Sequence, residues 1–142
     1  MLGALYPIPR YIPSHLATFI ANLDYLSQSR ALACFSTGHG HGEFLNYSPF
    51  PGVFPEVGMR VVQYEEGLRL ILKLWTRHGD VNFKGKYYSL LDVTIFPKPV
   101  KQPHPLIWHA GGGSRTLKIA AKYCDGVVNG VMLEGGLALP MR

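Results

Sequence analysis

The chain has 142 residues, of which 47% are hydrophobic and 16% charged, and its formal net charge is +5. The length corresponds to one ordinary domain. The composition is too apolar for a disordered chain, and 16 glycines and 11 prolines are too many for a helical bundle. No apolar stretch approaches the roughly 18 residues of a membrane span, so we expect no membrane partner.

The basic residues and the cysteines narrow the choice of partner and compartment. The 14 Lys and Arg residues are scattered along the chain, whereas a nucleic-acid surface gathers them on one face. We therefore expect no nucleic-acid partner. Cys34 and Cys124 are far apart and form no CxxC pair. A disulfide scaffold is therefore not expected, and the prediction is a reducing, cytoplasmic location.

Apolar runs of strand length alternate with amphipathic segments along the chain. Buried strands are predicted at residues 1–6, 31–36, 106–110 and 127–132. Helices are predicted from Pro13 to about Ser27, from Val57 to about Trp75, and after Ser114. Residues 81–90 predict a β-hairpin, and residues 37–42 and 45–55 predict loops. This order is typical of an α/β fold with a parallel sheet built from βαβ units.

Each predicted helix has an apolar stripe that we expect to face the core, because its members recur at steps of three and four residues. In chain order the stripes are Leu16, Phe19, Ile20, Leu23 and Leu26; then Val61, Tyr64, Leu68, Ile71, Leu72 and Trp75; then Leu117, Ala120, Ala121 and Cys124.

A glycine-rich loop follows the third predicted strand, at the strand end where α/β folds bind ligands. It reads Gly111, Gly112, Gly113, Ser114, Arg115. Glycines let a ligand approach the backbone, a helix N-terminus offers free N–H groups, Ser114 can cap the helix or donate to a phosphate oxygen, and Arg115 adds a positive charge. Glycine also serves tight strand-to-helix turns for steric reasons alone, so phosphate binding and a purely steric turn both stay open.

A second polar loop, His39-Gly40-His41-Gly42-Glu43, follows the second predicted strand. Its imidazoles and carboxylate are plausible zinc or iron ligands, but further ligands at a recognisable spacing are missing, so no metal is predicted. The pattern favours the polar wall of an active-site mouth, with His39 or His41 in proton transfer. A hydrolase is not favoured, since GxSxG is absent and Cys34 lies in an apolar strand.

Several stretches occur in an order that is far more specific than any one of them. They are PSHLA to LDYLSQSR (residues 13–30), ALACFSTGHGHGEF (31–44), residues 64–76 with FKGKYY (83–88), PKPVKQPHP (97–105) with IW and GGGSR (107–115), and AAKYCDG (120–126). Together they cover most of the chain, up to about residue 131. With these motifs the chain resembles the bacterial luciferase-like flavin- and deazaflavin-dependent oxidoreductases and monooxygenases.

The resemblance implies a TIM (β/α)8 barrel that binds FMN or a deazaflavin coenzyme of the F420 type and acts on a small-molecule substrate. A complete barrel needs eight βα units and about 250 residues. We therefore expect a partial TIM barrel of four parallel strands with a small hairpin insertion, spanning residues 1–132, and an unmatched tail at 133–142. The short chain is predicted to be a truncated form, impaired or inactive on its own.

Two other functions stay open at this point. One is a non-catalytic protein in which two half-barrels associate as a homo-oligomer and cover their open sheet edges. The other is a module that binds a phosphorylated ligand without redox chemistry.

The resemblance also implies residue roles. Leu5 and Tyr6 are expected behind the flavin or deazaflavin ring, and His39 at the substrate as the catalytic residue. The remaining cofactor-binding residues are Ser36, Thr37 and Gly38 along the pocket, and Gly111, Gly112, Gly113, Ser114 and Arg115 at the phosphate.

Overall fold

A computed structural model describes residues 1–47, 52–129, 132–133 and 136–137 of the chain. In chain order the elements are β1 (Leu2–Pro7), a 3-10 turn η1 (Ile8–Arg10), α1 (Pro13–Leu26), β2 (Ala31–Ser36), α2 (His41–Tyr47), α3 (Val57–Thr76), β3 (Val81–Lys84), β4 (Ser89–Val93), β5 (Leu106–Ala110), α4 (Ser114–Tyr123), β6 (Gly126–Val128), β7 (Met132–Leu133) and β8 (Gly136–Leu137).

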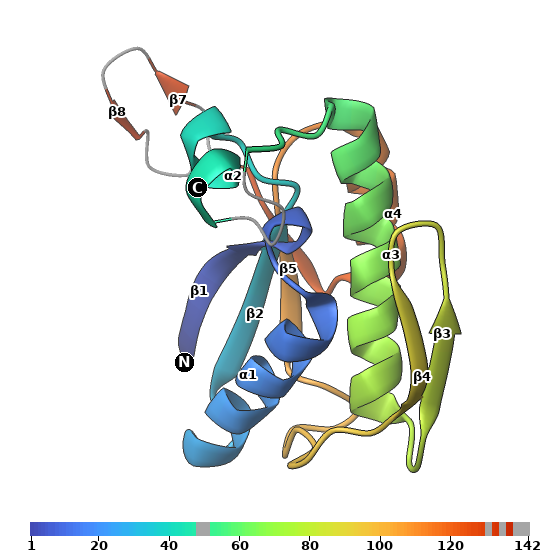
Figure 1. Cartoon of the computed structure of the whole chain (residues 1–142). Coiled ribbons are helices and arrows are strands. Elements are labelled where there is room, and N and C mark those ends of the chain that lie inside the picture. The colour runs from blue at the N-terminus through green and yellow to red at the C-terminus, as the bar shows by residue number, and fades with distance from the viewer. Residues whose placement is uncertain (48–51, 130–131, 134–135, 138–142) are drawn as a thin grey trace.

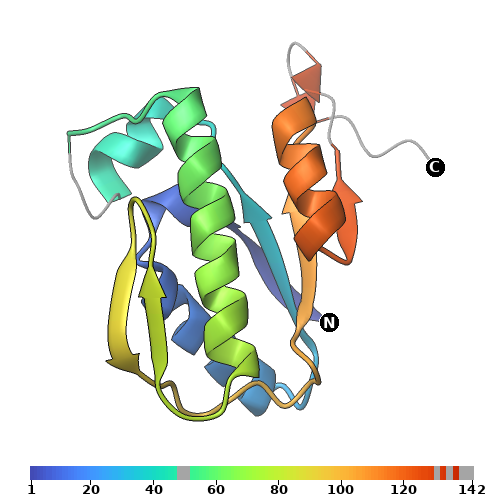
Figure 2. The ribbon, with the colours of Figure 1, turned by 90° about the vertical axis from the view of Figure 1, so that its right-hand side faces the viewer.

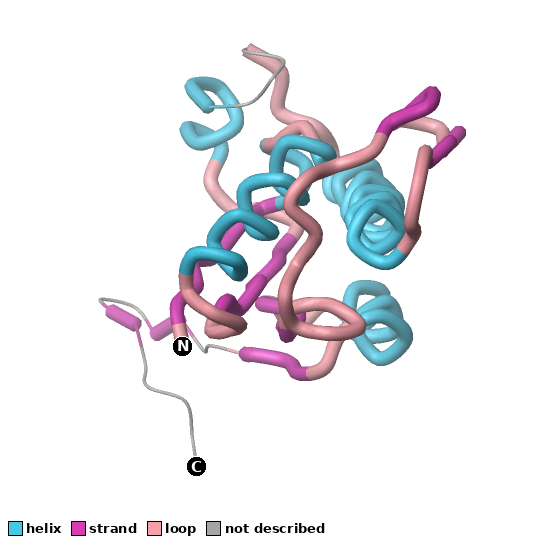
Figure 3. Tube along the Cα trace, turned by 90° about the horizontal axis from the view of Figure 1, so that it is seen from below, coloured by secondary structure: helices cyan, strands magenta, loops and turns pink. Residues whose placement is uncertain are grey.

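The main sheet has the order β1-β2-β5-β6, and every neighbouring pair is parallel. Helices α1, α3 and α4 all lie on one side of these strands, which is plain when the molecule is seen from below (Figures 1 and 3). The antiparallel hairpin β3-β4 packs on the outside of α3 (Figure 2). The predicted α/β fold with four parallel strands and a small hairpin is thereby confirmed.

The two faces of the sheet differ in burial because the helices of the described residues cover only one of them. Ala33, Phe35 and Ile107 point toward the helices and are fully buried. On the opposite face, Leu5 of β1, Cys34 of β2 and Trp108 of β5 are partners in register and form one row across the sheet. Leu5 is 54% exposed, and Cys34 and Trp108 are partly exposed. The next position in this row is Gly126, where a Cβ atom would lie 3.1 Å from the Trp108 indole.

The predicted core stripes are only partly right. The stripe of α3 is confirmed except that Leu72 is half-buried. In α1 the prediction is wrong for Phe19 and Leu26, which are 55% and 79% exposed. Small residues take their place: Ala17 and Ala21 are fully buried, and the Trp75 indole Nε1 donates to the Ala17 carbonyl at 2.9 Å.

The predicted loop around residues 41–47 and the predicted fourth strand also need correction. Residues 41–47 form helix α2, not a loop, because Phe44 is fully buried and packs edge-on against Phe54 at 5.4 Å. The fourth strand covers Gly126–Val128 rather than residues 127–132; Met132 lies in β7, which pairs with β8.

The predicted core stripe of α4 and the predicted tail are the last two points. In α4, Ala121 is exposed, and Thr116 and Ile119 are buried in the core stripe instead. Much of the predicted tail, 134–135 and 138–142, lies outside the described residues.

None of the helices in the described part of the chain is long and apolar enough to cross a membrane.

A buried carboxylate anchors the hairpin turn to α3. Glu66 is only 6% exposed. Its Oε2 accepts the Lys86 N–H at 3.0 Å, and its Oε1 accepts the N–H groups of Tyr87 and Tyr88 at 2.9 and 2.7 Å. A Cβ atom at Gly85 would collide with the same carboxylate, so glycine is required there.

We predict that Glu66→Ala lowers the free energy of unfolding by about 2–4 kcal/mol, because three backbone donors lose a charged acceptor. The matched control is Glu65→Ala, which removes the same charge one residue earlier on α3 and is expected to cost less than about 0.5 kcal/mol. Urea unfolding followed by tryptophan fluorescence measures both. Equal losses in the two variants would contradict the anchoring role.

Candidate functional site

Two neighbouring cavities lie at the C-terminal ends of β1, β2 and β5, and together they are called the recess. The first, of about 330 Å³, is lined by Leu5, Pro7, Arg10, Ser36, Thr37, Gly38, His39, Glu43, Ala110 and Gly111. The second, of about 320 Å³, is lined by Thr37, Val57, Val61, His109 and residues 110–116. The two share Thr37, Ala110 and Gly111. The recess therefore gathers the predicted site residues except Tyr6, and of the two candidate histidines it contains His39 but not His41.

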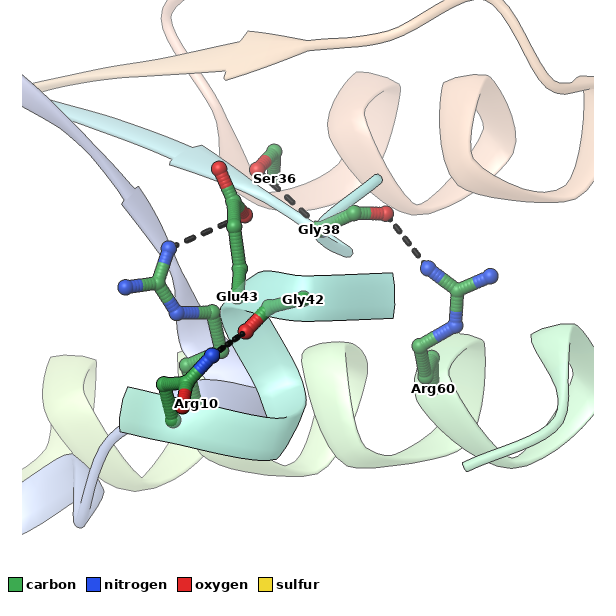
Figure 4. A network of polar contacts seen from close by, with 7 residues as sticks. Arg10, Ser36, Gly38, Gly42, Glu43 and Arg60 are labelled. Carbon is green, nitrogen blue, oxygen red and sulfur yellow. Dashed lines mark hydrogen bonds and ion pairs between the residues drawn. The ribbon is translucent and has the colours of Figure 1, made fainter. Parts of the chain in front are cut away.

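The loop after β2 is held in one conformation by contacts to α2 and α3. The Ser36 hydroxyl oxygen accepts the Gly38 N–H at 3.3 Å, and Arg60 on α3 donates to the Gly38 carbonyl (Figure 4). Gly38 has a φ of +80°, and a Cβ atom there would lie 2.6 Å from the Phe44 ring. Glycine at this position lets α2 pack against the loop that carries His39.

Two charged residues that the sequence analysis missed form part of the wall. Arg10 donates to the Glu43 carboxylate at 3.0 Å across the mouth of the first cavity (Figure 4). The Arg10 side chain is 14% exposed and that of Glu43 49%. Arg10 could have been found from its place in the short turn after the first strand, but its pairing with Glu43 depends on the position of α2. His39 lies next to this pair and is exposed.

The glycine-rich loop leaves backbone donors of α4 accessible and also meets a steric requirement. Gly113 is the N-cap of α4 and no side chain caps the helix, so its first N–H groups are left to a ligand or water. The steric need is also real, since a Cβ atom at Gly111 would lie 3.1 Å from His109 Nε2 and one at Gly112 would lie 3.0 Å from Asn129 Oδ1.

Tyr6 does not join the recess. Its ring lies on the helix side of the sheet, edge-on to Tyr11 and Phe19 at 6.1 Å and tilted against Phe35 at 6.4 Å. Burial, together with the nearby Tyr11, raises the pKa of its phenol. Its neighbour Leu5 points to the opposite face and lines the first cavity.

A buried polar chain lies behind the loop and was also missed. His109 is 1% exposed, and its Nδ1 is 2.9 Å from the Tyr64 hydroxyl, which in turn is 3.8 Å from Cys124 Sγ. Burial lowers the pKa of His109, an effect that the backbone of Phe35 opposes, and raises the pKa values of Tyr64 and Cys124. All three groups are therefore neutral at pH 7. A histidine inside an apolar strand, two residues before the glycines, was the available signal.

Among the described residues, no group of three or more His, Cys, Asp or Glu side chains could hold a metal ion. His41 instead packs edge-on against Phe54 at 4.9 Å.

The recess can be compared with known proteins once its geometry is clear. The sequence profile of the luciferase-like monooxygenases matches residues 1–134. The chain belongs to this family. The predicted resemblance is thereby confirmed. Over 126 residues the chain is 38% identical to an F420-dependent glucose-6-phosphate dehydrogenase of Kineococcus radiotolerans, covering 89% of this chain and 35% of that protein. It is 28% identical to an FMNH(2)-dependent dimethylsulfone monooxygenase of Pseudomonas putida, covering 95% of this chain and 36% of that protein.

Solved structures of luciferase-like enzymes have the same fold. An F420-dependent secondary alcohol dehydrogenase in complex with an F420-acetone adduct superimposes with a TM-score of 0.75 at 27% identity, over 87% of this chain and 36% of that one. A long-chain alkane monooxygenase superimposes with a TM-score of 0.79 at 21% identity, over 90% of this chain and 34% of that one. This luciferase-like chain thus spans about a third of the length of the relatives that it matches.

We predict that Gly38→Ala destabilises the luciferase-like chain by about 3–4 kcal/mol, because a positive φ and a clash with Phe44 add. Gly52→Ala is the matched control, since Gly52 has a φ of +82° and a Cβ atom there would meet no described atom within 4 Å. It should cost about 1–2 kcal/mol from backbone strain alone. Thermal unfolding measures the difference, and equal losses would show that the Phe44 contact imposes no requirement at position 38.

Proposed function

We propose that the chain forms the cofactor-binding part of a luciferase-like oxidoreductase, with FMN or an F420-type deazaflavin in the recess at the ends of β1, β2 and β5. The observation that carries this proposal is that residues from three separate strand ends line two neighbouring cavities that share Thr37, Ala110 and Gly111. The N-terminus of α4 has no side-chain cap and lies beside Arg115. The glycines leave the backbone N–H groups accessible, and this arrangement fits the phosphate of such a cofactor.

Between the two cofactors we favour the deazaflavin. The F420-dependent dehydrogenase of Kineococcus radiotolerans is 38% identical to this chain, against 28% for the FMNH(2)-dependent monooxygenase. Monooxygenation with FMN is the second candidate, because that relative also matches almost the whole chain.

Each residue of the recess would have a role that follows from its position. A bound deazaflavin or flavin supplies hydride transfer, and a reduced flavin can also activate oxygen. Gly111, Ser114 and Arg115 hold the phosphate through backbone N–H groups and the guanidinium. Leu5 offers apolar surface to the ring, and His39 exchanges a proton with a small-molecule substrate at the mouth. The Arg10–Glu43 pair keeps that side of the mouth in place.

We further propose that the 142-residue chain alone is impaired in catalysis. In the described residues the sheet face that carries Leu5, Cys34 and Trp108 is not covered by any helix (Figure 3). A cofactor ring in the recess would therefore have protein on one side and water on the other. Water contact weakens both ring binding and the exclusion of side reactions.

We predict that the isolated chain binds F420 and FMN in the micromolar range and turns either over slowly or not at all. Fluorescence titration of the cofactor measures binding, and absorbance of the cofactor with glucose 6-phosphate measures turnover. Arg115→Ala should weaken binding about tenfold through the lost charge on the phosphate. Lys122→Ala removes the same charge at the far end of α4 and should leave affinity unchanged.

Three other results would each contradict one part of the proposal. Turnover at rates typical of enzymes would overturn the impaired state of the chain. Binding of glucose 6-phosphate with neither cofactor bound would favour the phosphate-binding module. Equal effects of the Arg115 and Lys122 variants would move the phosphate away from the glycine-rich loop.

The exposed edge strand gives a specific reason to propose a homo-oligomer. In β1, Leu2 and Leu5 are 44% and 54% exposed at the edge of the sheet. Apolar edge strands favour pairing with another chain. A second copy would cover this edge and shield the open face.

We predict a dimer in sedimentation equilibrium at micromolar concentration. Leu2→Lys places a charge on the edge strand and should shift the chain to monomer. Leu26→Lys puts the same charge on an exposed position of α1 and should leave the dimer intact. If the wild-type chain is still a monomer at about 100 μM, its dissociation constant is higher than that of a weak specific interface, and the proposed assembly is contradicted.

A further inference from the structure

Behind the glycine-rich loop, one buried polar atom lacks a hydrogen-bond partner in the described part of the chain. His109 Nε2 is buried and, within the described residues, makes no hydrogen bond, although its side chain is only 1% exposed. Burying a polar group without a hydrogen-bond partner destabilises the folded protein. An orphan of this kind in a cavity wall points to a ligand atom that completes it.

The other side of the imidazole fixes what kind of partner Nε2 needs. Nδ1 is 2.9 Å from the Tyr64 hydroxyl, while Cys124 Sγ is 3.8 Å from that hydroxyl. The imidazole nitrogen is the closer and the stronger acceptor of the two, so we assign the phenol proton to it. A neutral imidazole that accepts at Nδ1 carries its proton on Nε2. Nε2 is thus a hydrogen-bond donor and needs an acceptor.

The position of Nε2 shows where that acceptor sits. A Cβ atom at Gly111 would lie 3.1 Å from Nε2 and 3.4 Å from Cε1, so the absence of a side chain opens the imidazole edge to the loop. His109 lines the same cavity as residues 111–116. The uncapped N-terminus of α4 also lines this cavity and offers more donors. The only acceptor noted beside the imidazole in the described residues is the backbone of Phe35, with which Nε2 makes no well-formed hydrogen bond. Donors that converge on this cavity from two directions fit an anion.

We propose that His109 Nε2 donates a hydrogen bond to an oxygen of a phosphate ester bound at residues 111–116, and that Tyr64 is the positioning residue that holds the imidazole in the donor tautomer. The proposal rests on the proposed function in that the loop must bind a phosphate. It adds a buried, neutral donor from β5 to the helix N–H groups and Arg115. The ester is that of the cofactor or of a phosphorylated substrate, which the test separates.

The test compares ligands that differ only in the phosphate. FMN and riboflavin represent the cofactor, and glucose 6-phosphate and glucose represent a substrate. His109→Met removes the donor and should lower the affinity for the phosphorylated member of one pair about tenfold or more, with less than a twofold change for its partner. His109→Gln retains an amide donor and should recover part of the loss. The ratio within a pair cancels any general loosening of the fold.

A spectroscopic measurement addresses Tyr64. In ¹⁵N spectra of the wild-type chain, His109 should show a protonated Nε2 and an unprotonated Nδ1. Tyr64→Phe removes the phenol, so the two tautomers should mix and the affinity for the phosphorylated ligand should fall about threefold. Tyr25→Phe, at an exposed position of α1, is the control and should change neither quantity.

The outcomes separate this inference from the proposed function. If wild-type protein prefers the phosphorylated member of a pair and His109→Met keeps that preference, only the role of His109 is wrong. If wild-type protein prefers neither FMN over riboflavin nor glucose 6-phosphate over glucose, the phosphate site itself is wrong and His109 loses its partner with it. A wild-type His109 protonated on Nδ1 would overturn the donor assignment directly.

Discussion

The parallel register of β1, β2 and β5 is the constraint on which the rest of the structure depends. Pro7 is the partner of Ser36, and Phe35 is the partner of His109, so three strand ends reach the same edge of the sheet. Segments about thirty and seventy residues apart thereby become the walls of one recess. Strands in an antiparallel arrangement would place these loops at opposite ends.

Helices on one side only determine how the sheet uses its two faces. The covered face holds most of the hydrophobic core, including Phe35 and Ile107. The uncovered face displays Leu5, Cys34 and Trp108 in one row, which in a closed barrel is the packed interior. Apolar surface left in water forgoes about 25 cal/mol per Å². The same face would border the cofactor ring, so covering it serves stability and function together.

The sequence predicted what local patterning controls and missed what tertiary contacts control. Apolar runs and turn residues located β2 and β5 to the residue, and the loops at their ends contain most of the site. Tyr6 was misplaced because adjacent strand residues face opposite sides, so choosing between Leu5 and Tyr6 needs the covered face to be known. Helix α2 was missed because Gly42 in its first turn weakens the helical signal, while burial of Phe44 against Phe54 supplies the missing stabilisation. The Arg10–Glu43 pair and the Tyr64–His109 bond join residues 33 and 45 positions apart, which no local pattern reveals.

Helix α3 links the parts of the site that the strands bring near one another. Arg60 holds the loop after β2, Tyr64 holds His109 behind the glycine-rich loop, and Glu66 holds the hairpin turn. Each contact is made by a buried polar group, which is costly unless its partner stays in place. A shift of α3 along its axis would strain all three contacts at once. The two cavities and the hairpin therefore respond to the position of α3 as one unit, although they belong to different segments of the chain.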